Sequence, residues 1–195
     1  MKVKMSGFKI NSKEIDKKIT NSREFKERTR DIVNKKLQKA KEELMREFNS
    51  HPVTQELQSG PAGANASGLL GGYRNLFSFM GFKSGSNPVE AVRLYLRESI
   101  KIKQGKSRGK TIEFLINTPT LEDFNFAKMP WESGNSWIVS IERGMSSFSY
   151  YMHKAYQASR AGVGMQIDHK LRGKSSAPTK YMSSILNNFR KRLTK

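Results

Sequence analysis

The stretch HPVTQELQSGPAGANASGLLGGYRNLFSFMGF, residues 51–82, decides how this chain is organised. It combines glycines with large apolar residues and follows a long basic helical pattern. A contiguous apolar strip on a glycine-punctuated segment either packs under its own subunit or docks on a neighbour. We predict that residues 51–82 form a glycine-rich apolar arm whose large side chains make a self-assembly interface. These side chains are Leu69, Leu70, Tyr73, Leu76, Phe77, Phe79, Met80 and Phe82.

A helical pattern precedes this arm. Apolar residues recur at spacings of three, four and seven from Phe25 to Phe48, and Asn21 with Glu24 matches a capping box. We predict one amphipathic helix over about residues 21–48 with a solvated, charged outer face. A helix of this length extends about 40 Å at 1.5 Å per residue, too far for a small sheet to cover. We therefore expect part of its apolar stripe to meet another subunit.

On the other side of the arm, helix and strand patterns alternate. Asn87-Pro88-Val89-Glu90 is typical of a helix start, with proline at the first helical position. Residues 101–110, KIKQGKSRGK, hold five basic residues, two glycines and no acid, which predicts a mobile cationic loop. A final helix is predicted after Ser176-Ala177-Pro178. Alternating apolar residues predict strands at 111–117 and 136–143, with weaker patterns at 147–153 and 163–169.

These patterns together define the predicted fold class. We predict a single α+β domain over residues 1–195, carrying the arm at 51–82 and the basic loop at 101–110. The long N-terminal amphipathic helix and the C-terminal helix pack on a small, mostly antiparallel β-sheet, with extended loops or arms.

The charge is strongly positive. The chain has 36 Lys and Arg against 17 Asp and Glu, a formal net charge of +19, which favours an anionic partner. The excess is spread along the sequence, with 15 basic and 8 acidic residues in 1–50, 9 and 3 in 51–110, and 12 and 6 in 111–195. The candidate contacts to DNA or phosphate are Lys101, Lys103, Lys106, Arg108 and Lys110. The alternative for this loop is a merely solvated charge run.

Catalytic and metal-binding patterns are weak. The absence of cysteine removes disulfides, thiol catalysis and cysteine-based zinc sites. No apolar stretch has secretory or membrane-spanning length, so we expect a soluble, non-secreted protein. Asp168-His169 with Asn187-Asn188 loosely resembles a His-Asn-His nuclease, but the third histidine of that pattern is missing. We predict no catalytic, metal or cofactor site and no enzyme; a metal-dependent nuclease at Asp168 and His169 is an alternative.

The segments taken together resemble the tail-completion, tail-terminator and neck proteins of tailed bacteriophages. The basic helix REFKERTRDIVNKKLQKAKEELMREF, residues 23–48, runs into the Pro-Val-Thr element HPVTQEL and a glycine and serine loop. A small sheet and a Pro-led closing helix, SAPTKYMSSIL at 176–186, follow. The loop at 63–85 is longer than in compact family members, and the segment 101–110 looks like an insertion.

This resemblance implies a non-enzymatic virion protein. It implies a ring, most often a hexamer, in the neck between the head connector and the tail tube, assembled in the host cytoplasm. The implied partners are other copies of the chain, tail tube or sheath proteins, head connector or adaptor proteins, and genomic DNA, with no membrane. The alternative from a different class is a free-standing, non-sequence-specific nucleic-acid-binding protein.

Overall fold

The computed structural model describes residues 16, 18, 19, 21–70, 75–108, 111–130, 132–144 and 179–194, with the backbone alone for 104–108, 111 and 132–135. The chain divides into two compact units. Unit 1 comprises residues 1–39 and 101–117, and unit 2 comprises residues 40–100 and 118–195. One helix crosses the boundary between the two units. The single domain over residues 1–195 stays a prediction.

That helix is α2, Arg23–Ser50, which confirms the predicted long helix. Its first turn is capped by Ser22 rather than by Asn21, because the Ser22 hydroxyl accepts a hydrogen bond from the Phe25 N–H at 3.3 Å. The apolar stripe is buried along the second half of α2, at Leu37, Ala40, Leu44 and Phe48. Full burial of a leucine or phenylalanine stabilises a fold by about 1.5–3 kcal/mol. Among the described residues in the first half of α2, the apolar side chains of this stripe are not buried to a comparable extent.

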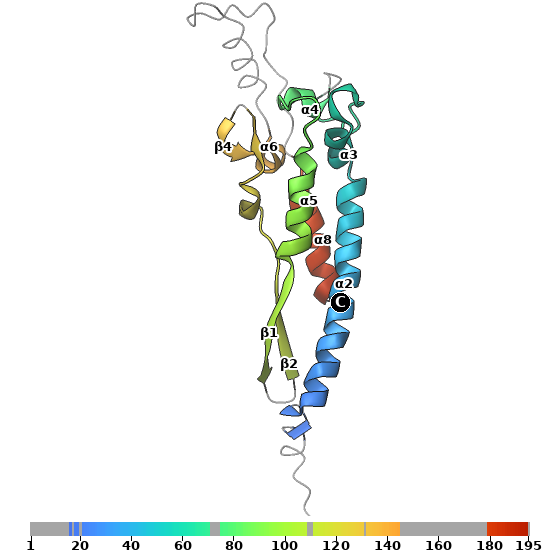
Figure 1. Cartoon of the computed structure of the whole chain (residues 1–195), viewed down its shortest axis with the longest axis vertical. Coiled ribbons are helices and arrows are strands. Elements are labelled where there is room, and N and C mark those ends of the chain that lie inside the picture. Colours follow the sequence, from blue (N-terminus) through green and yellow to red (C-terminus); the bar gives the residue numbers. More distant parts are fainter. Residues whose placement is uncertain are drawn as a thin grey trace, which may run out of the picture. The chain divides into compact units, whose positions relative to one another are not determined.

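Short helices make up most of the described remainder of unit 2 (Figure 1). The predicted helix after Asn87 is α5 (Pro88–Ser99), with Pro88 at its first position and Val92 and Leu96 buried. The predicted final helix is α8 (Met182–Thr194), with Tyr181 packed just before it. The helices are α3 (Pro52–Gln58), η1 (Gly60–Ala62), α4 (Leu76–Phe79), α5 (Pro88–Ser99), η2 (Glu122–Phe124), α6 (Trp137–Arg143) and α8 (Met182–Thr194).

The strand predicted at 136–143 is wrong, because these residues form helix α6. The Ser136 hydroxyl accepts a hydrogen bond from the Ile138 N–H at 3.2 Å and caps the helix. Four of its seven residues, Trp137, Ile138, Val139 and Ile141, are buried. A short helix buried on most sides shows no polar face, so its apolar residues also fit the alternation of a strand.

Two small antiparallel sheets confirm the α+β class. Strand β1 (Lys101–Arg108) pairs with β2 (Thr111–Asn117), and β3 (Lys128–Met129) pairs with β4 (Glu132–Ser136). The strand predicted at 111–117 is confirmed, whereas the loop predicted at 101–110 is wrong for its first eight residues. Between the pairs Lys103↔Leu115 and Lys106↔Glu113 the register shifts by one residue, a β-bulge. The weaker strand predictions at 147–153 and 163–169 lie outside the described residues.

The start of α8 is fixed by a side chain from another helix. The carboxylate of Glu142, on α6, accepts hydrogen bonds from the N–H groups of Tyr181 and Ser183 at 3.0 and 2.7 Å, and from the Ser183 hydroxyl at 2.8 Å. A carboxylate is favourable at this end of a helix because the unpaired N–H groups there carry partial positive charge.

None of the helices in the described ranges is long and apolar enough to cross a membrane.

Candidate assembly and polyanion surfaces

The segment HPVTQEL forms helix α3, and most of its side chains have structural partners. The His51 Nδ1 atom accepts a hydrogen bond from the Val53 N–H at 3.3 Å and so caps the helix, while Pro52 occupies the first helical position. Val53 and Leu57 are buried in the core. The hydroxyl groups of Thr54 and Tyr181 share a hydrogen bond of 2.6 Å in a fully buried environment. The segment therefore joins α2, α3 and the start of α8.

Glu56 is the buried acid of this segment. Its side chain is 1% exposed, and its two carboxylate oxygens accept hydrogen bonds from the Ser67 N–H at 2.8 Å and the Leu76 N–H at 2.6 Å. A buried carboxylate is costly unless such donors satisfy it. Glu56 thus fixes two points of the glycine-rich segment against α3.

Asn75 holds the same segment from its other end. Its amide nitrogen donates to the carbonyl oxygens of Gly60 and Gly63, both at 2.8 Å, and its amide oxygen accepts from the Ser78 N–H at 2.9 Å, capping α4. Sequence reasoning missed both Glu56 and Asn75. The available signal for Asn75 was its place directly before the apolar run Leu76–Phe79, since an asparagine there is a usual helix-start pattern.

The predicted self-assembly interface is largely core. Leu70, Leu76, Phe77 and Met80 are 8%, 0%, 1% and 0% exposed within their own chain. The prediction of an exposed arm is wrong for these four residues, because the hydrogen bonds of Glu56 and Asn75 draw the segment onto unit 2. Leu69, Phe79 and Phe82 are half-buried, and Tyr73 lies outside the described residues.

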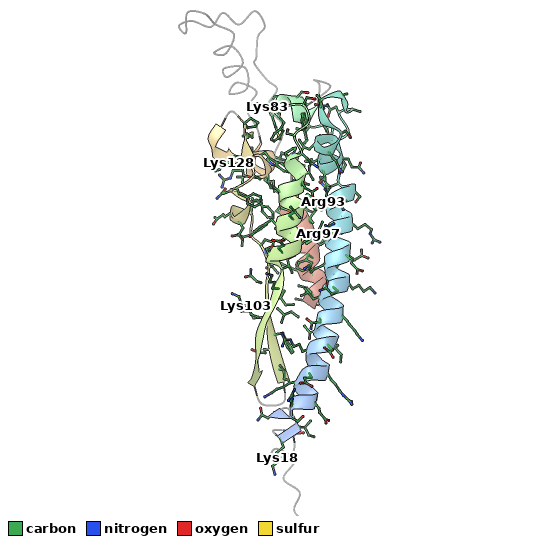
Figure 2. All side chains as sticks on the ribbon, viewed as in Figure 1. Lys18, Lys83, Arg93, Arg97, Lys103 and Lys128 are labelled. Atoms are coloured by element: carbon green, nitrogen blue, oxygen red, sulfur yellow. The ribbon has the colours of Figure 1, made fainter. Side chains whose placement is uncertain are left out.

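The predicted phosphate contacts fall on the two-stranded sheet of unit 1, called the hairpin below. Lys101 and Lys103 lie on β1 with exposed side chains, and Figure 2 labels Lys103 on this strand. Lys106 and Arg108 belong to β1 by their backbone, and Lys110 lies outside the described residues. The structure therefore places four of the five predicted residues on one strand instead of a loop.

The hairpin has two different faces. Ile102, Ile112, Phe114 and Ile116 are half-buried and share one face, since residues two apart point the same way and Ile102 pairs with Ile116. The other face is exposed and includes Leu115, whose side chain is 63% exposed opposite Lys103. Each strand has one partner among the described strands, so each has an outer edge that no described strand covers.

The described part of unit 1 has little core. Among its described side chains Leu37 alone is buried, at 4% exposure. Large apolar side chains stay in solvent instead, with Ile32 on α2 67% exposed. An isolated two-stranded sheet is marginally stable in water and needs a further strand or helix against its apolar surface.

The charge excess is concentrated in the same unit. Residues 1–39 hold 13 basic and 5 acidic residues, and residues 101–117 hold 5 and 1, so unit 1 carries +12 of the total of +19 on less than a third of the chain. The excess of basic residues is therefore spread along the whole sequence but is not spread evenly over the two units. Unit 1 is therefore strongly cationic, and its described side chains are poorly covered.

The titratable groups near α3 have structural explanations. Partial burial lowers the pKa of His51, and the nearby Glu142 carboxylate opposes this shift. Burial raises the pKa of Tyr181, so its hydroxyl stays protonated and available for the hydrogen bond with Thr54.

The predicted nuclease alternative gains no support. Asp168 and His169 lie outside the described residues, and Asn187 and Asn188 lie on α8. No group of three or more His, Asp or Glu side chains that could hold a metal ion occurs in the part of the chain that the structure describes.

The chain was compared with protein-family models, with curated proteins and with solved structures, and none of them matches.

Proposed function

We propose that this chain is a structural, non-enzymatic subunit of a tailed-bacteriophage neck, where copies form a ring between the head connector and the tail tube. The order of elements supports the proposal. A long basic helix, the HPVTQEL helix, a two-stranded sheet and a closing helix follow one another, as in the sequence resemblance. The proposed neighbours are tail tube or sheath proteins, head connector or adaptor proteins, and genomic DNA.

The exposed hairpin is the observation that carries this proposal. It has two edges without a described partner strand and an exposed Leu115 in a unit where Leu37 is the one buried side chain among those described. Both features are unfavourable in an isolated soluble subunit, because free edges and exposed apolar residues promote association. A second copy of the chain that covers this hairpin would satisfy them.

The charges of the two strands favour contact between different edges. Strand β1 carries Lys101, Lys103, Lys106 and Arg108 without an acid, whereas β2 carries Glu113 without a base. Contact of β1 with β1 would bring like charges together, and contact of β1 with the β2 of the next copy would not. A contact between two different surfaces is the kind that generates closed rings.

Replacement of Leu115 with serine tests the proposal, with Leu94→Ser as the matched control. Leu94 is also an exposed leucine, at 48%, but it lies on α5 in unit 2. We expect the unaltered protein and L94S to form rings by negative-stain electron microscopy, and L115S to shift toward monomer by light scattering. A monomeric unaltered protein would reject the ring, and an unchanged oligomer in L115S would reject this contact.

The second candidate function is non-sequence-specific nucleic-acid binding, which the +12 charge of unit 1 favours. A free-standing binder would be a monomer that binds duplex DNA tightly with a steep dependence on salt. A ring that binds DNA weakly would favour the neck protein.

A further inference from the structure

The β-bulge in β1 decides which face of the hairpin its basic residues occupy. In a regular strand, Lys103 and Lys106 are three positions apart and would lie on opposite faces. The bulge adds one residue between them, so Lys103 pairs with Leu115. Lys106 then pairs with Glu113, two positions earlier on β2. Because residues two apart on β2 share a face, the strand positions of Lys103 and Lys106 share that face as well.

The other two basic residues of β1 follow the same register. Lys101 pairs with Asn117, and Arg108 pairs with Thr111. These partners alternate with the half-buried apolar residues of β2, which lie on the opposite face. Four basic positions of β1 therefore lie along one face of the hairpin, and we call them the basic row: Lys101, Lys103, Lys106 and Arg108.

The face that carries the basic row also contains one acid. Glu113 is exposed directly opposite Lys106, so the net charge of this face is +3. The exposed Leu115 lies beside Glu113 on the same strand. The face is thus divided lengthwise, with the positive charge along β1 and the acid and the apolar side chain along β2.

We propose that the basic row binds the phosphate backbone of duplex DNA. The row pairs with seven residues of β2, Thr111–Asn117, and extends about 20 Å at 3.4 Å per residue. Duplex DNA presents one phosphate charge per about 1.7 Å of its axis, so several phosphates lie within reach. Contacts from lysine and arginine to phosphates position a protein without reading sequence. The inference rests on the proposed contact with DNA and names its surface, and it does not require a ring.

Other occupants fit the basic row less well. A surface that lies in a lipid bilayer has a wide apolar face, whereas Leu115 is the one large apolar side chain described on this face. A second copy that pairs through β2 brings Glu113 as the one charged residue of that strand, which cannot neutralise four cations. That edge contact also lies in the plane of the sheet, so it leaves the face of β1 open.

The test compares double variants with equal change in charge. K101Q/K103Q removes two cations from the basic row, and K83Q/K180Q removes two exposed lysines from unit 2. K101R/K103R keeps the charge of the row. Circular dichroism checks that each variant folds as the unaltered protein does. Binding to a fluorescent duplex of random sequence is measured by anisotropy over about 50–200 mM salt.

We expect the slope of log affinity against log salt to fall by about 2 in K101Q/K103Q, because each lost phosphate contact removes about 0.9. Affinity near 0.1 M salt should fall between roughly tenfold and sixtyfold. K101R/K103R should bind as the unaltered protein does, and K83Q/K180Q should change the slope much less. Equal effects of K101Q/K103Q and K83Q/K180Q, or no binding by the unaltered protein, would overturn the proposal.

A second pair tests the shared face. K106Q/R108Q should lower the slope as K101Q/K103Q does, because the bulge places both pairs on one face. No effect of K106Q/R108Q would overturn the basic row. Binding to vesicles of anionic phospholipid in the absence of DNA binding would assign the face to a membrane surface and would also overturn the proposal.

The test keeps DNA binding separate from ring assembly. The change in salt slope caused by K101Q/K103Q should be the same when it is combined with L115S, the variant that tests the contact between copies. A ring that forms without binding DNA would overturn this inference alone, and a monomer that binds DNA through the row would reject the ring and support the inference.

Discussion

Replacement of Glu56 with alanine should destabilise unit 2, although Glu56 has no catalytic or binding role in the functions proposed. The substitution leaves the N–H groups of Ser67 and Leu76 without their acceptors. A buried donor left unpaired costs about 1–3 kcal/mol, so two cost about 2–6 kcal/mol. The substitution also removes a buried charge that has no described ion-pair partner, and this removal offsets part of the cost. We therefore expect a net destabilisation of about 3 kcal/mol.

Urea unfolding measures this change, and Gln55→Ala on the same helix is the matched control because Gln55 is exposed. With a slope of about 2–3 kcal/mol per molar urea, E56A should lower the midpoint by about 1–1.5 M. Glu56→Gln keeps one acceptor oxygen and should have an intermediate effect. Hydrogen exchange should accelerate at the amides of Ser67 and Leu76 in E56A.

A midpoint for E56A equal to that of Q55A would refute the reasoning, because it would mean that Glu56 does not hold residues 67–76 against α3. Faster exchange spread evenly over unit 2, without an excess at Ser67 and Leu76, would show a general loss of stability and would also contradict the assigned contacts.

Three further predictions concern the same region. The pKa of His51 is lowered in the folded protein, so the unfolded chain binds a proton at this histidine more readily. The contribution of His51 to stability is therefore full above pH 6.5 and declines as the pH falls below that value. His51→Asn, which keeps a capping oxygen, should flatten this dependence in urea midpoints measured at pH 7.5 and about 5, and an unchanged pH profile would contradict the prediction. Tyr181→Phe should cost about 1–3 kcal/mol because it leaves the buried Thr54 hydroxyl unpaired, while the double variant with Thr54→Val should recover much of the loss; additive losses in thermal unfolding would argue against the pairing. Glu142→Ala should cost about 0.5–2 kcal/mol and expose the Ser183 amide to hydrogen exchange, and continued protection of that amide would show that another group caps α8.

Long periodic segments could be predicted from the sequence. Helices α2 and α5 carry apolar residues at helical spacing over three turns or more, and β2 alternates over its whole length. Strand β1 could not be predicted in this way, because KIKQGKSR lacks alternation and has low strand propensity. Its strand conformation follows from pairing with β2, which overrides local preference.

Whether residues 51–82 are exposed or buried depends on contacts that the local sequence pattern does not reveal. A glycine-rich segment with many large apolar residues has the composition of both an exposed docking arm and a folded-back core segment. The hydrogen bonds that decide between them join Glu56 to residues 11 and 20 positions away, and Asn75 to residues 12 and 15 positions away. Because such pairs leave no periodic signal, the buried state of Phe77 could not be read from the sequence.

The burial of that segment changes where an assembly surface is expected. In the described part of unit 2, apolar residues of this segment such as Leu76 and Met80 are buried, and the starts of α3 and α8 are capped by His51 and Glu142. Unit 1 keeps an open hairpin and most of the positive charge. Since association is favoured where apolar surface and free edges remain, we expect the proposed contact between copies, and any contact with an anionic partner, to involve unit 1.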